Sequence, residues 1–156
     1  MIQEESTRHS VHHLLRQQQL GVLSTMGEGE PYASLVAYTV SDDDRYLSFV
    51  TPRATRKFAN LSANGRVALL VNNSINRPED FLQAMAVTAT GIAKPVSSRQ
   101  KEDMLKHYIS KHPHLEEFAR SANSELVIIR VERYILVKHF QNVTEFEVNR
   151  DYGETS

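Results

Sequence analysis

The sequence predicts a mainly β domain, an antiparallel β-barrel with helices at its periphery. Short apolar segments of strand length recur along the chain, and compact polar turns join many of them. The turn at residues 41–45, for example, contains three aspartates, a residue type that favours turns. Strands joined mostly by hairpins, with helices outside them, are typical of an antiparallel barrel.

The first third of the chain contains a helix and three strands. Residues 6–19 have apolar positions at spacings of three and four, which predicts an amphipathic helix with Ser6 or Thr7 as its cap. Strands are expected at residues 21–25, 32–40 and 46–50. Two glycines and a proline mark the turn before the second of these strands.

The rest of the chain continues to alternate between expected helices and strands. A helix is expected at 56–63, closed by Asn64-Gly65. The segment 66–72 is almost continuously apolar, which predicts a strand buried on both faces. The remaining expected elements are strands at 86–93, 126–131, 134–140 and 144–148, and a helical excursion at 97–122 made of helices at 97–111, capped by Ser97 or Ser98, and 115–122.

Length and composition predict one domain, spanning residues 1–156, with residues 1–20 as its N-terminal helix segment. The 18 basic and 19 acidic residues give a net charge of −1, which argues against a nucleic-acid binder. The absence of cysteine excludes thiol catalysis and disulfides. The polar N-terminus resembles neither a signal peptide nor a membrane span, so we expect a cytoplasmic protein without a membrane partner.

The segment 51–57, TPRATRK, is the most informative for function. It lies between a strand and a helix start, where backbone N–H groups and the helix dipole favour a phosphate. Thr55 can cap the helix or donate to a phosphate oxygen, while Arg56 and Lys57 supply positive charge. In the alternative interpretation, Thr55 is a plain helix cap and the cations are solvated.

The neighbouring expected strand, at residues 32–40, carries several small side chains. Ser34, with Ala33 and Ala37 beside it, would let a flat ring approach the backbone. The alternative, favoured on the residues alone, is that small side chains pack in a tight barrel interior.

The seven histidines do not form a recognisable metal motif. His9 and His13 lie four apart on one helix face, but no third ligand accompanies them, so we expect a solvated face and no metal. His107, His112 and His114 surround a helix break and are expected to be exposed. His139 lies in an apolar segment and is expected to be partly buried.

Taken together, these segments resemble the pyridoxamine 5′-phosphate oxidase-like superfamily of FMN-binding split β-barrels. The resemblance runs from about residue 11 to residue 95. GVLST resembles the first strand of that family and PYASLVAY the second. The stretch YLSFVTPRATRKFANLSANGRVALLV resembles the third strand, phosphate loop, helix and fourth strand, and AVTATGIAKPV resembles the strand that carries the family's glycine.

The resemblance implies an FMN-dependent oxidoreductase of unknown substrate, a homodimer with flavin bound between its subunits and a small-molecule substrate. The implied cofactor contacts are Ser34, Leu35, Val36, Val50, Thr51, Thr55, Arg56 and Lys57. The last three resemble the family's Ser-Arg-Lys phosphate grip. No residue stands out as a catalytic acid or base.

The chain also departs from the oxidase itself. Ser34 stands where the oxidase has Arg, Thr39 where it has Lys, and Ala86 where it has Gln, and the oxidase's C-terminal Trp and Arg have no counterpart. Pyridoxamine phosphate oxidation is therefore not expected. Two alternatives stay open: a haem-binding protein related to the haem-utilisation branch, with His139 as ligand, and a binding module without catalysis.

Overall fold

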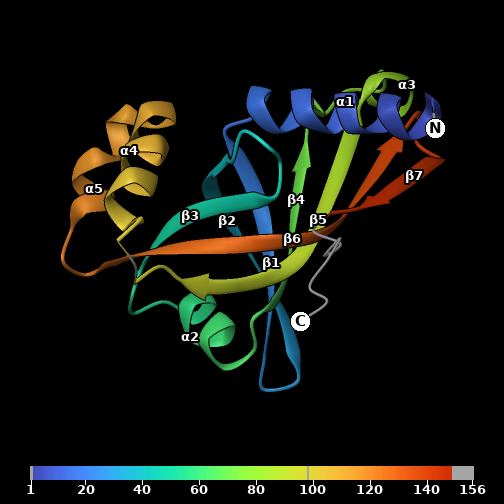
Figure 1. Ribbon diagram of the computed structural model, residues 1–156. Coiled ribbons are helices and arrows are strands. Elements are labelled where there is room, and N and C mark those ends of the chain that lie inside the picture. The colour runs from blue at the N-terminus through green and yellow to red at the C-terminus, as the bar shows by residue number, and fades with distance from the viewer. Residues whose placement is uncertain (1, 98, 149–156) are drawn as a thin grey trace, which may run out of the picture.

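The computed structural model describes residues 2–97 and 99–148 and shows a β-barrel with helices around it (Figure 1). The strands are β1 (Leu20–Gly27), β2 (Glu30–Val40), β3 (Tyr46–Pro52), β4 (Arg66–Asn72), β5 (Met85–Pro95), β6 (Ser124–Lys138) and β7 (Asn142–Glu147). The helices are α1 (Ile2–Gln17), α2 (Arg56–Ala63), α3 (Asp80–Gln83), α4 (Lys101–Lys111) and α5 (Glu116–Arg120), with a 3₁₀ turn η1 at Pro113–Leu115.

All strand pairings are antiparallel, and the sheet closes on itself. The strand order is β3-β2-β1-β4-β5-β6-β7, and an additional pairing of β3 with β6 joins the two sides of the sheet. β1 to β6 thus form the closed barrel and β7 extends it beyond β6. The predicted mainly β class, with an antiparallel split β-barrel and peripheral helices, is confirmed.

β6 corrects the prediction of two strands at 126–131 and 134–140. It is one strand, Ser124–Lys138, and the register against β5 shifts between Thr90 and Gly91 so that Glu132 is the extra residue of a bulge. The backbone oxygen of Glu132 accepts a hydrogen bond from the N–H of Val148 instead. A Cβ atom at Gly91 would collide with the backbone oxygen of Arg130, so this close approach requires glycine.

β4 corrects the prediction of a strand buried on both faces. Its bounds are as predicted, but burial alternates: Val67, Leu69 and Val71 face the core, whereas Ala68 and Leu70 face outward. The apolar run therefore has one face in the core and leaves apolar side chains on the outer surface of the barrel.

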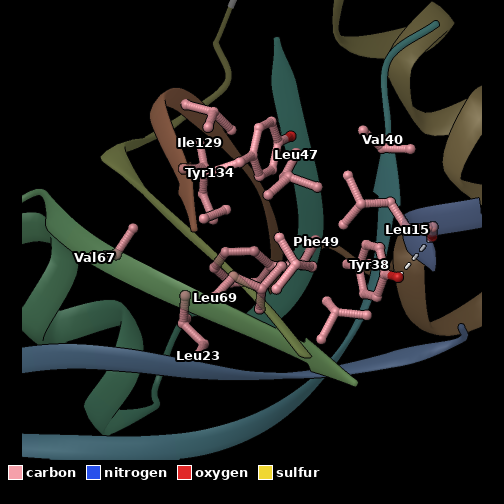
Figure 2. Packing of buried hydrophobic residues seen from close by; sticks show 14 of the residues in the cluster. Leu15, Leu23, Tyr38, Val40, Leu47, Phe49, Val67, Leu69, Ile129 and Tyr134 are labelled. Atoms are coloured by element: carbon pink, nitrogen blue, oxygen red, sulfur yellow. Dashed lines mark hydrogen bonds between the residues drawn. The ribbon is translucent and has the colours of Figure 1, made fainter. Parts of the chain in front are cut away.

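The core cluster contains branched and aromatic side chains from all seven strands and from α1 and α2. Tyr38, Phe49 and Tyr134 are fully buried in this cluster (Figure 2). α1 lies across one end of the barrel (Figure 1), where Val11, Leu14 and Leu15 enter the core. The hydroxyl of Tyr38 donates to the backbone oxygen of Leu15 at 2.6 Å, which ties α1 to β2 (Figure 2).

Several helix boundaries differ from the expectations. α1 begins at Ile2, so Thr7 lies inside the helix and donates to the oxygen of Gln3 rather than capping the start. α4 begins at Lys101 after Gln100, which caps it without a side-chain hydrogen bond; Ser97 does not serve as the cap, and Ser98 lies outside the described residues. The helix expected at 115–122 is the shorter pair of η1 and α5. No helix among residues 2–97 and 99–148 is long and apolar enough to cross a membrane.

Candidate functional site

β2 and β3 run side by side over a short distance and then part. Their pairing covers only Tyr38, Thr39 and Val40 opposite Phe49, Ser48 and Leu47. From there β3 continues along β6 as far as Pro52, whereas β2 follows β1 back to Glu30. The barrel is therefore split between these two strands, and the backbone of β2 at the parting point needs other hydrogen-bond partners.

α4 and its C-cap contact the backbone of β2 at Ala37, just beyond the pairing, and at two residues within it. The hydroxyl of Tyr108 donates to the backbone oxygen of Ala37 at 3.2 Å, and Nε2 of His112 lies 2.7 Å from the backbone oxygen of Tyr38. His107 makes a similar contact, 3.0 Å, to the backbone oxygen of Val40. The helical excursion is thus fastened along β2 and covers one side of the split.

A concavity of about 460 Å³, which we call the split hollow, lies where the strands part. Its volume is within the range of small-molecule sites, about 300–1,000 Å³. Its lining is mostly apolar and comes from β1, β2, β3, α2 and the helical excursion. The lining residues are Gln19, Leu20, Leu35, Val36, Ala37, Val50, Pro52, Lys57, Tyr108, His112, His114, Leu115 and Phe118.

The TPRATRK segment forms the turn that leads into α2. Thr55 is the N-cap: its hydroxyl oxygen accepts from the N–H of Phe58 at 3.3 Å, and it lies 3.0 Å from the hydroxyl of Thr51. The cap predicted at Thr55 is confirmed. Thr51 is fully buried, so this pair fixes the start of α2 to the end of β3.

The three cations of this turn differ in their surroundings. Arg53 forms an ion pair with Glu125 at 2.9 Å. Within the part of the chain that the structure describes, neither Arg56 nor Lys57 forms an ion pair; the Arg56 guanidinium lies over the Tyr32 ring, 5.1 Å from its centroid, and Lys57 lines the split hollow. Two charges at the N-terminus of α2 therefore remain without an acidic partner, as an anion site requires.

Arg56 lies in a second, adjacent concavity of about 580 Å³. Thr55 and Tyr32 line it together with Arg53 and Asn60. The Thr55–Lys57 turn thus separates two hollows, with Lys57 facing the apolar one and Arg56 facing the polar one.

The structure brings most of the predicted contact residues to this turn and the split hollow, but not all of their side chains. Leu35, Val36, Val50 and Lys57 line the hollow, and Thr51, Thr55 and Arg56 surround the turn. Because side chains alternate along a strand, Leu35 points outward whereas Ser34 and Val36 share the inner face of β2 with Tyr38. A planar ligand in the hollow would therefore meet Leu35 directly.

Ser34 carries an unmet hydrogen-bonding group. Its hydroxyl oxygen is buried and has no partner among the residues that the structure describes. Buried hydroxyls in native proteins are almost always satisfied. Ser34 is not among the residues that line the split hollow, and its side chain lies on the face of β2 opposite Leu35.

Sequence reasoning missed the histidine that matters most for this site. His112 was expected to be exposed, but it is only 1 % exposed and lines the split hollow beside Tyr108. The available signal was the spacing of four between Tyr108 and His112, which puts both on the buried face of α4. Burial lowers the pKa of His112 below its usual 6.5 and raises that of Tyr108 to about 12.

The other histidines leave no metal site in the described part of the chain. His9 and His13 contact each other edge to face, 4.5 Å between ring centroids, and no group of His, Asp and Glu residues able to hold a metal ion is found among residues 2–97 and 99–148. The predicted partial burial of His139 is wrong. It is exposed in the turn between β6 and β7, where Nδ1 contacts the backbone oxygen of Leu82 at 2.8 Å.

Comparison with known protein families identifies the class to which this chain belongs. The family model described as "Pyridoxamine 5′-phosphate oxidase" matches residues 7–138, and the chain belongs to that family. A curated relative is the 5a,11a-dehydrotetracycline/5a,11a-dehydrooxytetracycline reductase of Streptomyces rimosus, 33% identical over 91 residues, which cover 56% of this chain and 63% of the relative.

Solved structures show the same fold at low identity. A heme binding protein from Mycobacterium smegmatis superposes with a TM-score of 0.78 at 15% identity, over 87% of this chain and 55% of that protein. An FAD-binding protein from Mesorhizobium loti gives 0.66 at 17% identity, over 82% and 91%. The chain thus spans only about half of the mycobacterial protein and under two thirds of the reductase.

Proposed function

We propose that this chain is an FMN-binding oxidoreductase of the pyridoxamine 5′-phosphate oxidase family that acts as a cytoplasmic homodimer on a small-molecule substrate. The observation that carries the proposal is the position of Lys57, which lies in the first turn of α2, forms no ion pair with any residue in 2–97 or 99–148, and lines the apolar split hollow. A flavin mononucleotide needs this combination, because it joins a flat, largely apolar ring system to a dianionic phosphate.

Different residues bind the phosphate and the ring of the flavin. Arg56, Lys57 and the first N–H groups of α2 hold the phosphate, and Thr55 fixes the turn that presents them. Leu35 and Val50 offer apolar surface for the ring. The bound flavin would supply electron or hydride transfer, while the protein determines its orientation and its access to water.

An apolar row on the outer barrel supports the homodimer. Val22 of β1 lies opposite Leu35 of β2 on one side and Leu70 of β4 on the other. Leu35 is 63% exposed and Leu70 37%. Exposed apolar rows of this kind are typical of contact surfaces. Because Leu35 belongs both to this row and to the split hollow, a second copy on the row would lie beside the bound ring.

Haem is the competing ligand, since one structural neighbour is a heme binding protein. The split hollow does not include His139, whose Nδ1 already contacts Leu82. We therefore expect His139→Ala to leave FMN affinity within about threefold, well under one hydrogen bond's contribution.

Titration of the ligand-free protein with FMN, riboflavin and hemin tests the proposal. We expect saturable FMN binding with quenched flavin fluorescence, riboflavin binding weaker by about tenfold or more because it lacks the phosphate, and no stoichiometric hemin complex. Tight hemin binding with a Soret shift that disappears in His139→Ala, and no measurable FMN binding, would establish the haem alternative instead.

A further inference from the structure

The two ring nitrogens of His112 have different environments. Nε2 lies 2.7 Å from the backbone oxygen of Tyr38. A carbonyl oxygen can only accept a hydrogen bond, so Nε2 carries the proton and donates. The imidazole of His112 is packed against the Tyr108 ring, 5.0 Å between centroids, and that ring is itself held on β2 through Ala37. Both the tautomer and the orientation of His112 are therefore fixed by the protein.

Nδ1 is the remaining polar atom. It makes no hydrogen bond to any residue among 2–97 and 99–148, although the side chain is 1 % exposed and lines the split hollow. Burial lowers the pKa of His112, so the ring is neutral at neutral pH and Nδ1 has a free lone pair. Nδ1 is not among the fully enclosed side-chain atoms that lack a partner, and His112 lines the hollow, so Nδ1 can accept a hydrogen bond from a ligand N–H or O–H there.

The chemistry of the hollow limits what that donor can be. Apart from Gln19, Lys57, His112 and His114, the side chains on its lining are apolar or aromatic. Lys57 offers positive charge and His112 offers an acceptor, so the matching ligand is flat and apolar with an anionic group and a ring-edge donor. The oxidised isoalloxazine ring of FMN has one ring N–H, at N3.

We propose that Nδ1 of His112 accepts a hydrogen bond from N3–H of the flavin bound in the split hollow. The proposal rests on the FMN function above and deepens it, because it assigns the edge of the ring that faces the helical excursion. No cofactor contact was expected from this excursion on sequence grounds. His112 would act as a specificity residue for ligands with a donor at this position.

Methylation of N3 provides the test, with equilibrium binding as the measurement. The parent protein should bind FMN about ten- to a hundredfold more tightly than 3-methyl-FMN, since the methyl group removes the donor and leaves Nδ1 unpaired. In His112→Leu this preference should fall to within about threefold. His112→Gln should keep most of the preference, because its amide can donate to Tyr38 and also accept.

His114→Leu is the matched control, since His114 lines the same hollow but is exposed. It should retain the parent's preference for FMN over 3-methyl-FMN. Equal binding of the two flavins by the parent overturns the assignment of His112 even if the His112→Leu variant does not fold, and so does a preference that persists in a folded His112→Leu. A parent that binds neither flavin instead overturns the proposed FMN function itself.

Discussion

Nε2 of His112 donates a 2.7 Å hydrogen bond to the backbone oxygen of Tyr38 and thereby joins the end of α4 to the strand where the barrel splits. Tyr38 is the residue at which the pairing of β2 with β3 ends, opposite Phe49, and the imidazole contacts its backbone oxygen. The contact links the stability of the helical excursion to the shape of the split hollow, because His112 belongs to both.

The protonation of His112 should make folding stability depend on pH. Burial, the largest cause, lowers the pKa of His112 below 6.5, and the nearby Lys111 and His114 lower it further. Below about pH 6.5 the unfolded chain then binds more protons than the folded one, so the free energy of unfolding should fall as the pH falls. Urea denaturation of the parent and of His112→Gln at about pH 7.5 and about pH 5.5 checks this. A loss of stability on acidification that is equal in both proteins would contradict the assignment to His112.

Thr55 should contribute to stability through the α2 cap. Thr55→Ala removes the acceptor of the Phe58 N–H and the contact with Thr51, at an expected cost of about 1 kcal/mol in the free energy of unfolding. Thr55→Ser keeps the hydroxyl and should lose much less. Chemical denaturation of the three proteins measures the difference. An Ala variant as stable as the parent would show that the cap contributes little here.

Arg56 should act on the phosphate and not on the ring. Because it has no acidic partner among the described residues, Arg56→Ala should weaken FMN binding by about ten- to a hundredfold, the effect of losing one charge-assisted hydrogen bond. Riboflavin binding should be little affected. Arg53→Ala is the matched control, since Arg53 lies in the same turn but is paired with Glu125. Equal losses for FMN and riboflavin would mean that Arg56 supports folding instead.

The sequence predicts this turn well because its signals are local. The cap at Thr55, α2 and β4 all lie within a few residues of the patterns that indicate them, and their bounds agree with the structure. The sequence predicts two strands where the structure has β6, because the polar residues 132 and 133 interrupt the apolar pattern. In the structure the strand continues through them, and a bulge against β5 takes up the extra residue.

The burial of His112 depends on a long-range contact that local sequence signals do not indicate. Its partner Tyr38 is 74 residues away in the chain, and only the closure of the barrel brings the two together. A Pro follows His112 directly, which favours a helix end but gives no information about burial. The outer face of β4 was likewise undecidable, since an apolar run fits a buried strand and a strand that meets a second subunit equally well.

The outer face of β4 leads to the final prediction, which concerns assembly. If the row formed by Leu35, Val22 and Leu70 is a two-fold contact, then Leu70→Glu places a charge in both halves of the interface at once, because a two-fold axis presents the same residue from each subunit. We expect the parent to sediment at twice the chain mass of 17.8 kDa at micromolar concentration and Leu70→Glu to shift toward the monomer.

Ile2→Glu is the control, since Ile2 is also exposed but lies on α1, away from this row. FMN binding should weaken together with dimerisation in Leu70→Glu, because the split hollow adjoins the row at Leu35. A parent that sediments as a monomer, or a Leu70→Glu variant that remains fully dimeric, would show that the apolar row is not the interface.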